Sequence, residues 1–483
     1  MVGYLENIIQ NIHPWLLVTS GFSLAILVIW LIVPLLTKLV QCLKKPKAIP
    51  FHKAPSVSIL VPAYNEEAVI LDSVQSLMAL EYDNYEVIVV NDASTDNSMA
   101  LMKRTWGLEL DTTTRPERSL STTKIKGLYR SPMFPRLLVI DKKRSGQGKA
   151  DALNVALGYA RNKLVCTMDA DSVLDPDSLA KIARPFVEHP ETVAVSGGVR
   201  AGNGSRVREL NQHKPRFMKS ALIVNQALEY MNIYYVLKLM QRHLNGIYCV
   251  AGVFGLFSKK ALVDVGGYRV GTATEDIDLT MRLHVHHKAN KIPYRITHVE
   301  EATCWTEVPY TNRLFYNQRL RWQSGAVQVL LKHKNVLFNP RYGWVGFFIM
   351  PSLMLSVAGP VIGVSMLALM TYLAASYQPW LVATLFLFGQ AVAFLPVMMG
   401  WIMVGLYSKR WNVGQGAYSL GVAVFTNFFY NMALLAITSI GLYKVLLSNS
   451  SISWGEMTRA GFRQQELPPL AVKVANGRGP VRA

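Results

Sequence analysis

The sequence contains few cysteines and none of the common glycine-rich phosphate loops. Its four cysteines are scattered over 483 residues without a CxxC pair, which argues against a structural zinc site and against a disulfide framework. Neither GxGxxG nor GxxxxGKS/T occurs, so a dinucleotide fingerprint and a Walker loop are both absent. The polar part of the chain is therefore expected to be reduced and cytosolic, and any phosphate that it binds needs other partners.

Acidic residues are outnumbered, because 31 Asp and Glu stand against 50 Lys and Arg and leave a formal charge of +19. Such a balance suits nucleic acid, anionic lipid or a phosphorylated small molecule. The sequence has no zinc-finger spacing, RNP-like aromatic motif or isolated basic helix, so we expect no nucleic-acid partner. Much of the charge adjoins apolar segments, where it can meet membrane lipids.

The chain does not lack apolar runs, since 51% of its residues are hydrophobic. Trp15–Thr37 carries no charge and has no small-residue cleavage site behind it, which predicts a membrane-spanning helix that stays in the mature chain. No Lys or Arg precedes this run, whereas lysines crowd residues 38–53 after it. This asymmetry places the following domain in the cytosol.

Two further uncharged runs, Tyr342–Ser408 and Trp411–Tyr443, predict a C-terminal membrane bundle. At about 20 residues per crossing, the first run holds two or three passes, with candidate breaks at Gly359–Pro360 and near Gln378–Pro379. Two passes plus one would leave the tail outside. Three plus one, or a re-entrant segment, would leave it inside, and the basic residues of the tail favour the inside.

The middle of the chain alternates β-branched apolar runs with helix-like stretches. The runs at 57–67, 85–95, 137–143 and 163–172 each end in polar residues. This pattern predicts an α/β fold whose parallel strands are fully buried and whose chemistry lies at their carboxyl ends. Residues 110–132, rich in Thr and Ser, are expected to form an exposed insertion.

Carboxylates gather behind one of these strands, in Asp169-Ala-Asp171. A D-x-D on a tight turn offers hard oxygen ligands that suit Mg²⁺ or Mn²⁺ bridged to a diphosphate. Taken alone the motif is weak, since aspartates at strand ends are often turns or helix caps.

A second acidic group lies in TED, residues 274–276, with Asp278 close behind. The simplest reading is a helix start, in which Thr274 caps and the first-turn dipole favours Glu275 and Asp276. The nearby histidines at 284, 286 and 287 could suggest a metal, but their spacing points them apart on a helix, and we expect them at a surface or an interface.

Residues 318–322 read QRLRW. On a helix, Gln318, Arg321 and Trp322 share one face and present an amide, a guanidinium group and an aromatic ring together. The alternative is an amphipathic helix that places Arg and Trp at the lipid boundary. Taken alone, the segment favours that alternative.

The order of these motifs is more specific than any one of them. VPAYNEE (61–67), Asp92, GKADALN (148–154), DAD, TED and QRLRW together resemble the signature of membrane-embedded family 2 glycosyltransferases, the GT-A-fold enzymes that include cellulose, hyaluronan and poly-N-acetylglucosamine synthases. The resemblance runs from about Val57 to Trp322. It implies an α/β GT-A domain over 44–340 that faces the cytosol at the plasma (inner) membrane. A membrane helix with its basic flank (1–43) would precede it, and a membrane bundle (341–447) and a basic tail (448–483) would follow.

The resemblance also implies roles for individual residues. Tyr64 and Asp92 match positions that hold the uracil and uridine of a UDP-sugar donor, and Glu66 belongs to the same nucleotide site. Lys149 matches a lysine near the diphosphate, and Asp169 and Asp171 match the site of the metal and the nucleotide sugar. The helix over the diphosphate and acceptor is matched by Gln318, Arg321 and Trp322.

Asp276 matches the general base, which accepts the proton of the acceptor hydroxyl as it attacks the anomeric carbon. A divalent cation with Lys149 and Arg321 would offset the charge on the leaving diphosphate. Glu275 and Asp278 are assigned to orientation and helix capping. In the tail, Trp454 and Arg459 loosely resemble a hyaluronan synthase segment that closes the nucleotide site, and a tail lying on anionic lipid is the alternative.

Three functions fit these observations. The first is a processive synthase that extends a β-linked glycan and exports it through a channel in the spanning bundle, with an accessory export or regulatory subunit. The second is a single transfer to a lipid acceptor, and the third is a receptor or scaffold with a vestigial transferase domain. Every expected carboxylate is present, which favours catalysis. CVAGVFGLF (249–257) departs from the acceptor motif of cellulose synthases, so the sugar and linkage stay open.

Overall fold

The computed structural model describes residues 32–40, 54–117, 120, 123–145, 148–205, 207–211, 219–376, 379–407 and 413–447. Most of the expected N-terminal membrane helix lies outside this part of the chain, as do Trp454, Arg459 and the rest of the tail. Residues 32–40 are helical, and Thr37 Oγ1 lies 2.8 Å from His243 Nε2, so this segment contacts the polar domain.

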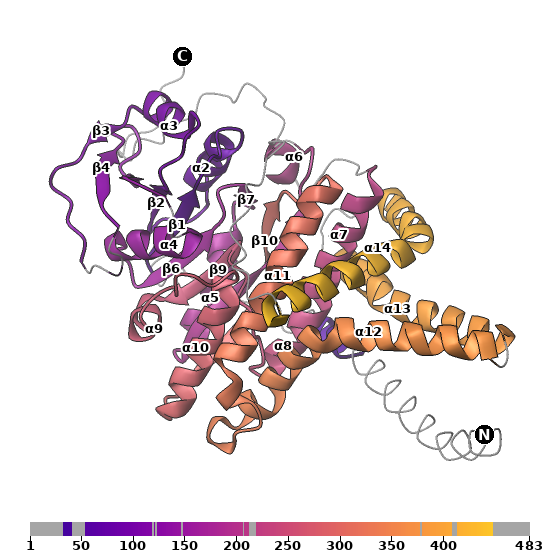
Figure 1. The fold of residues 1–483 in the computed structure, drawn as a ribbon. Helices are drawn as coiled ribbons and strands as arrows, with labels where there is room; N and C mark the ends of the chain where they lie inside the picture. Colours follow the sequence, from indigo (N-terminus) through magenta and orange to yellow (C-terminus); the bar gives the residue numbers. More distant parts are fainter. Residues whose placement is uncertain are drawn as a thin grey trace.

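The described strands form one ten-stranded mixed sheet in the order β3-β4-β5-β2-β1-β6-β9-β8-β10-β7 (Figure 1). β5, β2, β1 and β6 run parallel and are almost entirely buried, which confirms the expected α/β class. The strands are β1 (Val57–Ala63), β2 (Tyr85–Asn91), β3 (Glu109–Leu110), β4 (Ile125–Arg130), β5 (Leu137–Lys142), β6 (Leu164–Met168), β7 (Ser172–Leu174), β8 (Thr192–Ala201), β9 (Phe254–Ser258) and β10 (Arg295–Thr306).

Helices cover both faces of the parallel strands because successive side chains of a strand point to opposite faces. Ile59 and Val61 pack in one core with residues of α2, whereas Leu60 between them packs in a second core with residues of α4. The helices of this domain are α2 (Ile70–Met78), α3 (Ser98–Trp106), α4 (Gly148–Tyr159), α5 (Ser178–Glu188), α6 (Val207–Asn211), α7 (Ala221–Asn232), η2 (Ile233–Leu237), α8 (Lys238–His243), α9 (Lys259–Asp264), α10 (Glu275–Ala289) and α11 (Asn312–Lys332).

The segment 110–132 is not only an exposed insertion. Its residues 125–130 form β4, which pairs antiparallel with β5 near the edge of the sheet. Only Leu128 of this strand is buried, so the apolar pattern of residues 125–130 is too weak to predict a strand. The expectation for this part of the segment was therefore wrong.

Three long helices follow the polar domain, after the short turns η3 (Lys334–Val336), η4 (Pro340–Tyr342) and η5 (Val345–Ile349). α12 (Met350–Ser376) extends away from the sheet, α13 (Pro379–Tyr407) packs against α7 and η2, and α14 (Val413–Leu447) lies against α7 and α11 (Figure 1). α12 continues through Pro360, so the candidate break there is wrong.

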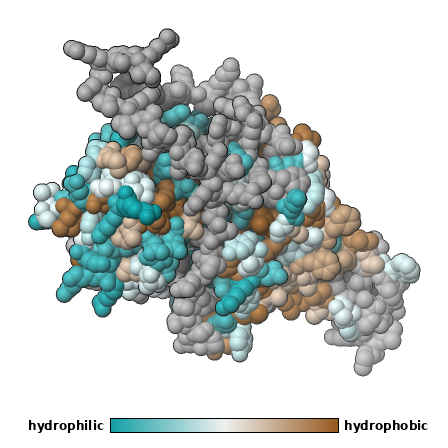
Figure 2. Space-filling model, turned by 90° about the horizontal axis from the view of Figure 1, so that it is seen from above, coloured by the Kyte–Doolittle hydropathy of each residue, from teal (hydrophilic) through white to brown (hydrophobic). Residues whose placement is uncertain are grey.

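Among the described residues, Val345–Leu369 and Val413–Leu447 are long and apolar enough to cross a membrane, and Phe394–Leu406 is a shorter apolar stretch. Figure 2 shows hydrophobic residues gathered over the helical end of the molecule and hydrophilic residues over the sheet domain. Three full crossings would put the tail opposite the sheet domain, so its cytosolic placement from charge stays a prediction.

Candidate active site

The loops after β1 and β2 are joined at the carboxyl edge of the sheet. The Asp92 amide donates to Ala63 O at 2.8 Å, and the Thr95 amide donates to Asn65 Oδ1 at 2.8 Å. Asn65 has a φ of 55°, a left-handed conformation that asparagine tolerates in turns. These contacts hold the loop around Tyr64, whose side chain stays exposed at the strand ends.

The Glu66 amide donates to Ser98 Oγ at 3.0 Å, which ties this residue to the start of α3. The structure thus brings Tyr64, Glu66 and Asp92 together at one edge, as the motifs predicted.

Asp92 itself is buried and already paired. It forms an ion pair with Lys142 and accepts a hydrogen bond from Ser145 Oγ at 2.9 Å. Lys142, almost fully buried, also lies 2.7 Å from Asp151. Burial raises the pKa of Asp92, and the Lys142 ammonium opposes that rise. Sequence reasoning missed Lys142, although a lysine so close behind the apolar run LLVI (137–140) is a signal that could have found it.

Lys149 joins three of the motifs. Its ammonium forms an ion pair with Asp169, lies 3.4 Å from Glu275 and donates to Gly252 O at 3.3 Å. Burial lowers the pKa of Lys149, but the carboxylates of Asp169 and Glu275 outweigh it and raise the pKa above its usual range. At Glu275 the direction is also upward, because burial outweighs the attraction of Lys149.

The two aspartates of the D-x-D differ in access. The side chain of Asp169 is 26% exposed, whereas Asp171 is buried and accepts hydrogen bonds from Ser172 Oγ at 3.0 Å and Thr306 Oγ1 at 3.4 Å. The described residues contain no group of three or more His, Cys, Asp or Glu placed to hold a metal. One or two carboxylates suffice for Mg²⁺ when substrate phosphates complete the shell, so the pair fits such an ion, with Asp169 as the accessible ligand.

Asp276 lies in the first turn of α10. Its Oδ2 accepts from the Gly252 amide at 3.2 Å and from Cys249 Sγ at 3.6 Å, and its Oδ1 accepts from the Ile277 amide at 2.9 Å. The segment 249–257, which departs from the cellulose synthase motif, therefore contacts this carboxylate directly. Sequence reasoning did not foresee this contact, since it joins segments distant in the chain.

Thr274 does not cap α10, contrary to expectation. Its hydroxyl makes no hydrogen bond with the residues that the structure describes. The Thr274 side chain packs instead against Gly325 of α11, where an added Cβ would lie 2.4 Å from Thr274 Oγ1. The start of α10 and α11 approach each other closely here, and they can do so because Gly325 has no side chain.

QRLRW lies within a helix, α11, so that Gln318, Arg321 and Trp322 share one face. Arg321 Nη1 donates to Ala273 O at 3.3 Å, directly before the TED residues. The Arg319 guanidinium lies 4.4 Å from the centre of the Trp322 ring, and Gln318 is buried with an Oε1 that accepts no hydrogen bond from the described residues. α11 also packs against α14, so it serves the predicted site and the helical bundle together.

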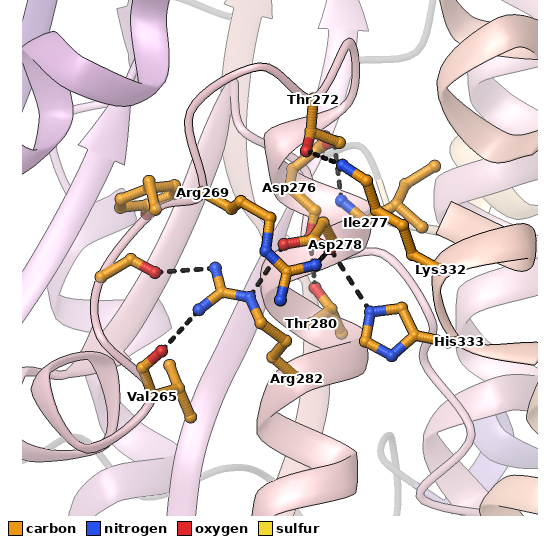
Figure 3. A network of polar contacts seen from close by, with 12 residues as sticks. Val265, Arg269, Thr272, Asp276, Ile277, Asp278, Thr280, Arg282, Lys332 and His333 are labelled. Carbon is orange, nitrogen blue, oxygen red and sulfur yellow. Dashed lines mark hydrogen bonds and ion pairs between the residues drawn. The ribbon is translucent and has the colours of Figure 1, made fainter. Parts of the chain in front are cut away.

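Asp278 is a buried hub, not a helix cap (Figure 3). Its carboxylate lies 2.9 Å from Arg269 Nη1, 2.8 Å from Arg282 Nε and 3.3 Å from His333 Nε2. Burial would raise the pKa of Asp278, but these partners lower it below its usual value.

The surface expectation is also wrong for His284 and His287, which are both buried. His284 Nε2 lies 2.8 Å from Ile247 O, and its Nδ1 lies 2.8 Å from Tyr294 Oη. A carbonyl only accepts, so Nε2 carries the proton and Nδ1 accepts from the tyrosine. Burial lowers the pKa of His284 to about 4.

The model of the glycosyltransferase like family 2 matches residues 54–325, more than half of the chain, and the chain belongs to this family. The poly-beta-1,6-N-acetyl-D-glucosamine synthase of Staphylococcus aureus (strain COL) is similar, at 29% identity over 289 residues, 60% of this chain and 58% of the relative. The synthase of the same name from Staphylococcus epidermidis is 30% identical over 281 residues, 58% of this chain and 57% of the relative.

The chain thus matches less than two thirds of the length of these curated relatives. Among solved structures, the mannosyltransferase PcManGT from Pyrobaculum calidifontis, in complex with GDP-Man and Mn²⁺, is similar with a TM-score of 0.49 and 20% identity. That similarity covers 84% of this chain and 97% of the other. The family resemblance read from the motifs is confirmed, while the roles of single residues stay predictions.

Proposed function

We propose that this protein is an inverting glycosyltransferase that moves a sugar from a UDP-sugar to a growing β-linked polysaccharide. Family membership supports the reaction class, and the two relatives named as poly-beta-1,6-N-acetyl-D-glucosamine synthases support a polysaccharide of N-acetylglucosamine as the product. Together with the UDP-sugar that the motifs imply, this makes UDP-N-acetylglucosamine the proposed donor. The polar domain lies at the plasma (inner) membrane and faces the cytosol, where nucleotide sugars are made. Export, with or without an accessory subunit, belongs to this proposal.

One observation carries the proposal furthest: Lys149 unites the carboxylates of Asp169 and Glu275 beside the helix that bears Asp276. A donor diphosphate in this site would meet the ammonium of Lys149 and the guanidinium of Arg321, which offset the negative charge that grows on the leaving group. Asp169 and Asp171 would hold a divalent cation, which would supply Lewis-acid stabilisation to the diphosphate.

Asp276 accepts the proton in this scheme. The Gly252 and Ile277 amides orient its carboxylate, which keeps it aimed while the acceptor hydroxyl approaches. The hydroxyl oxygen attacks the anomeric carbon as the bond to the diphosphate breaks, and its proton passes to Asp276. Tyr64 and Asp92 hold the uridine, and Trp322 offers a ring on which a sugar can stack.

The test is sugar incorporation by the purified full-length chain in lipid nanodiscs, with radiolabelled UDP-N-acetylglucosamine, UDP-glucose and UDP-glucuronic acid and with Mg²⁺ or Mn²⁺. We expect incorporation from UDP-N-acetylglucosamine into a product that a gel resolves as a polymer. A product of one sugar on an extracted lipid would replace the polymer by a single transfer. No incorporation from any of the three donors by a chain that is folded and binds UDP would contradict the proposal.

A further inference from the structure

We propose that Asp278 is a positioning residue. Its carboxylate clamps the loop 265–274, which precedes α10, against α10 and α11, and this clamp orients the carboxylate of Asp276. The inference rests on the proposed function and deepens it, because it adds a residue that acts on the predicted base through its surroundings. Asp278 touches neither the metal pair nor Asp276 through its side chain in the contacts described above.

The hub ties three segments to one carboxylate. Arg269 comes from the loop, Arg282 from α10, and His333 from the residue after α11 (Figure 3). Asp278 is fully buried, with an exposed fraction of 0%, and Arg282 and His333 are largely shielded from water as well, whereas Arg269 reaches the carboxylate from the surface. Ionic hydrogen bonds of this kind are stronger than neutral ones and fix geometry as well as charge.

The first half of the loop is held from α10 and α4. Arg282 donates to Val265 O at 2.6 Å and to Gly267 O at 2.7 Å. The side-chain amide of Asn154 in α4 donates to Tyr268 O and accepts from the Tyr268 amide, both at 2.7 Å. Asp278 thus holds the Nε of the same guanidinium whose Nη1 and Nη2 donate to the loop.

The second half of the loop is held from α11. Lys332 Nζ donates to Thr272 Oγ1 at 2.8 Å, and the Ala273 amide donates to Gln328 Oε1 at 3.3 Å. Arg321 and Gly325 meet the next residues, as described above. The helix that carries QRLRW is therefore fastened to the chain just before Asp276.

The loop needs a clamp because its own sequence does not stiffen it. Gly266, Gly267 and Gly271 have φ values of 80°, 70° and 76°, which suit glycine, and glycine loses the most freedom on ordering. Asp276 follows this loop within the first turn of α10. A displacement of about 1 Å at a reacting group costs on the order of 10²-fold in rate, so a loosely held loop that displaces Asp276 lowers the rate of transfer.

Arg269 is the sharpest place to test the clamp. Its side chain is 42% exposed, and its loss leaves Asp278 paired with Arg282 and His333. Arg269→Gln therefore loosens the loop without leaving an unpaired buried charge. Lys260→Gln is the matched control, because it removes a basic side chain, 83% exposed, from an ion pair with Asp264 on α9.

The experiment compares the wild type, Arg269→Gln and Lys260→Gln as full-length chains in nanodiscs. It measures kcat, the KM for UDP-N-acetylglucosamine, the thermal midpoint and amide deuterium uptake. For Arg269→Gln we expect kcat to fall by about tenfold with the KM and the midpoint close to wild type, as for a loss of orientation at the transition state. Uptake should rise over 265–276 in this variant and stay unchanged in the control.

A wild-type kcat, or an unchanged uptake over 265–276, would overturn the clamp. So would a loss of kcat that comes with a lowered thermal midpoint, since that would show general destabilisation. The uptake arm needs no transfer reaction, and it decides the clamp even if the wild type transfers no sugar, which is the result that contradicts the proposed function. The two failures are therefore distinguishable.

Discussion

Lys149 and Asp169 form an ion pair that fastens the first turn of α4 to the end of β6. The same ammonium lies 3.4 Å from Glu275, so one cation stands between the D-x-D and the TED residues. Its position is what would let a nucleotide diphosphate, the predicted metal and the predicted base share one small volume.

Replacement of Lys149 should therefore damage both binding and turnover. In Lys149→Met we expect kcat/KM to fall by about 10²-fold or more, because Glu275 and Asp169 lose their cation and the diphosphate loses a donor. Lys149→Arg keeps the charge and should retain more activity than the methionine variant. Steady-state kinetics over a range of UDP-N-acetylglucosamine concentrations measures this, and a methionine variant with wild-type kcat/KM would contradict the role.

Asp276→Asn should abolish transfer while sparing nucleotide binding, because the amide has almost the same volume but cannot accept the proton. Loss of a general base typically costs about 10² to 10⁴ in rate. Titration calorimetry with UDP provides the control, since its affinity should match the wild type. Turnover above a tenth of wild type would assign the base to another group.

Removal of the divalent metal ion should inactivate the enzyme reversibly. Treatment with EDTA should remove wild-type activity, and Mg²⁺ or Mn²⁺ should restore it, because Asp169 and Asp171 are the carboxylates predicted to hold the ion. Asp171→Ala and Asp169→Ala should stay inactive after metal is returned. Full wild-type activity in metal-free buffer would rule out this assignment.

Acid should destabilise the fold through His284. Its folded-state pKa of about 4 lies below the ordinary value of 6.5, so the neutral form stabilises the fold fully above pH 6.5 and this stability is lost as the pH falls toward 4. The loss amounts to on the order of 3 kcal/mol.

His284→Gln keeps a donor for Ile247 O and cannot titrate, so its thermal midpoint should fall less steeply between about pH 7 and pH 4.5. His298, whose pKa burial lowers to about 3, acts in the same direction and remains in both proteins. Parallel midpoint curves for the two proteins would show that His284 does not contribute.

The tail should lie in the cytosol, a prediction from charge that concerns residues outside the described part of the chain. With the native cysteines replaced, a cysteine at Ser451 should resist a membrane-impermeant thiol reagent in intact cells. Labelling from outside would contradict both this placement and a gate formed by Trp454 and Arg459. Protection, with Trp454→Ala lowering turnover more than expression, would support the gate.

Local sequence patterns predicted much of the fold. The apolar runs that became β1, β2, β5 and β6 were visible because a buried parallel strand is apolar on both faces. The helix α11 followed from side-chain spacing in the same way. Polar residues at strand ends could be placed at one edge of the sheet, since parallel strands end together there.

The contacts that pair those residues could not be read in this way. Three kinds of contact join segments far apart in the chain: Lys142 beside Asp92, Asp278 between Arg269 and His333, and His284 against Ile247. Charged and titratable residues are ordinarily exposed, so a sequence pattern places them at the surface until a partner is known. β4 escaped notice because this strand near the edge of the sheet buries only Leu128 and therefore shows little periodicity.

The sequence by itself determined the α/β class, the family and the motif residues of the candidate site, because these depend on periodicity and on motifs that are local. Only the tertiary structure decided which carboxylate is accessible to a ligand and which is enclosed. Asp169 remains accessible while Asp278 is enclosed, although both are aspartates in motif segments. That difference arises from burial and from partners brought in by the fold, and neither is written in the order of residues along the chain.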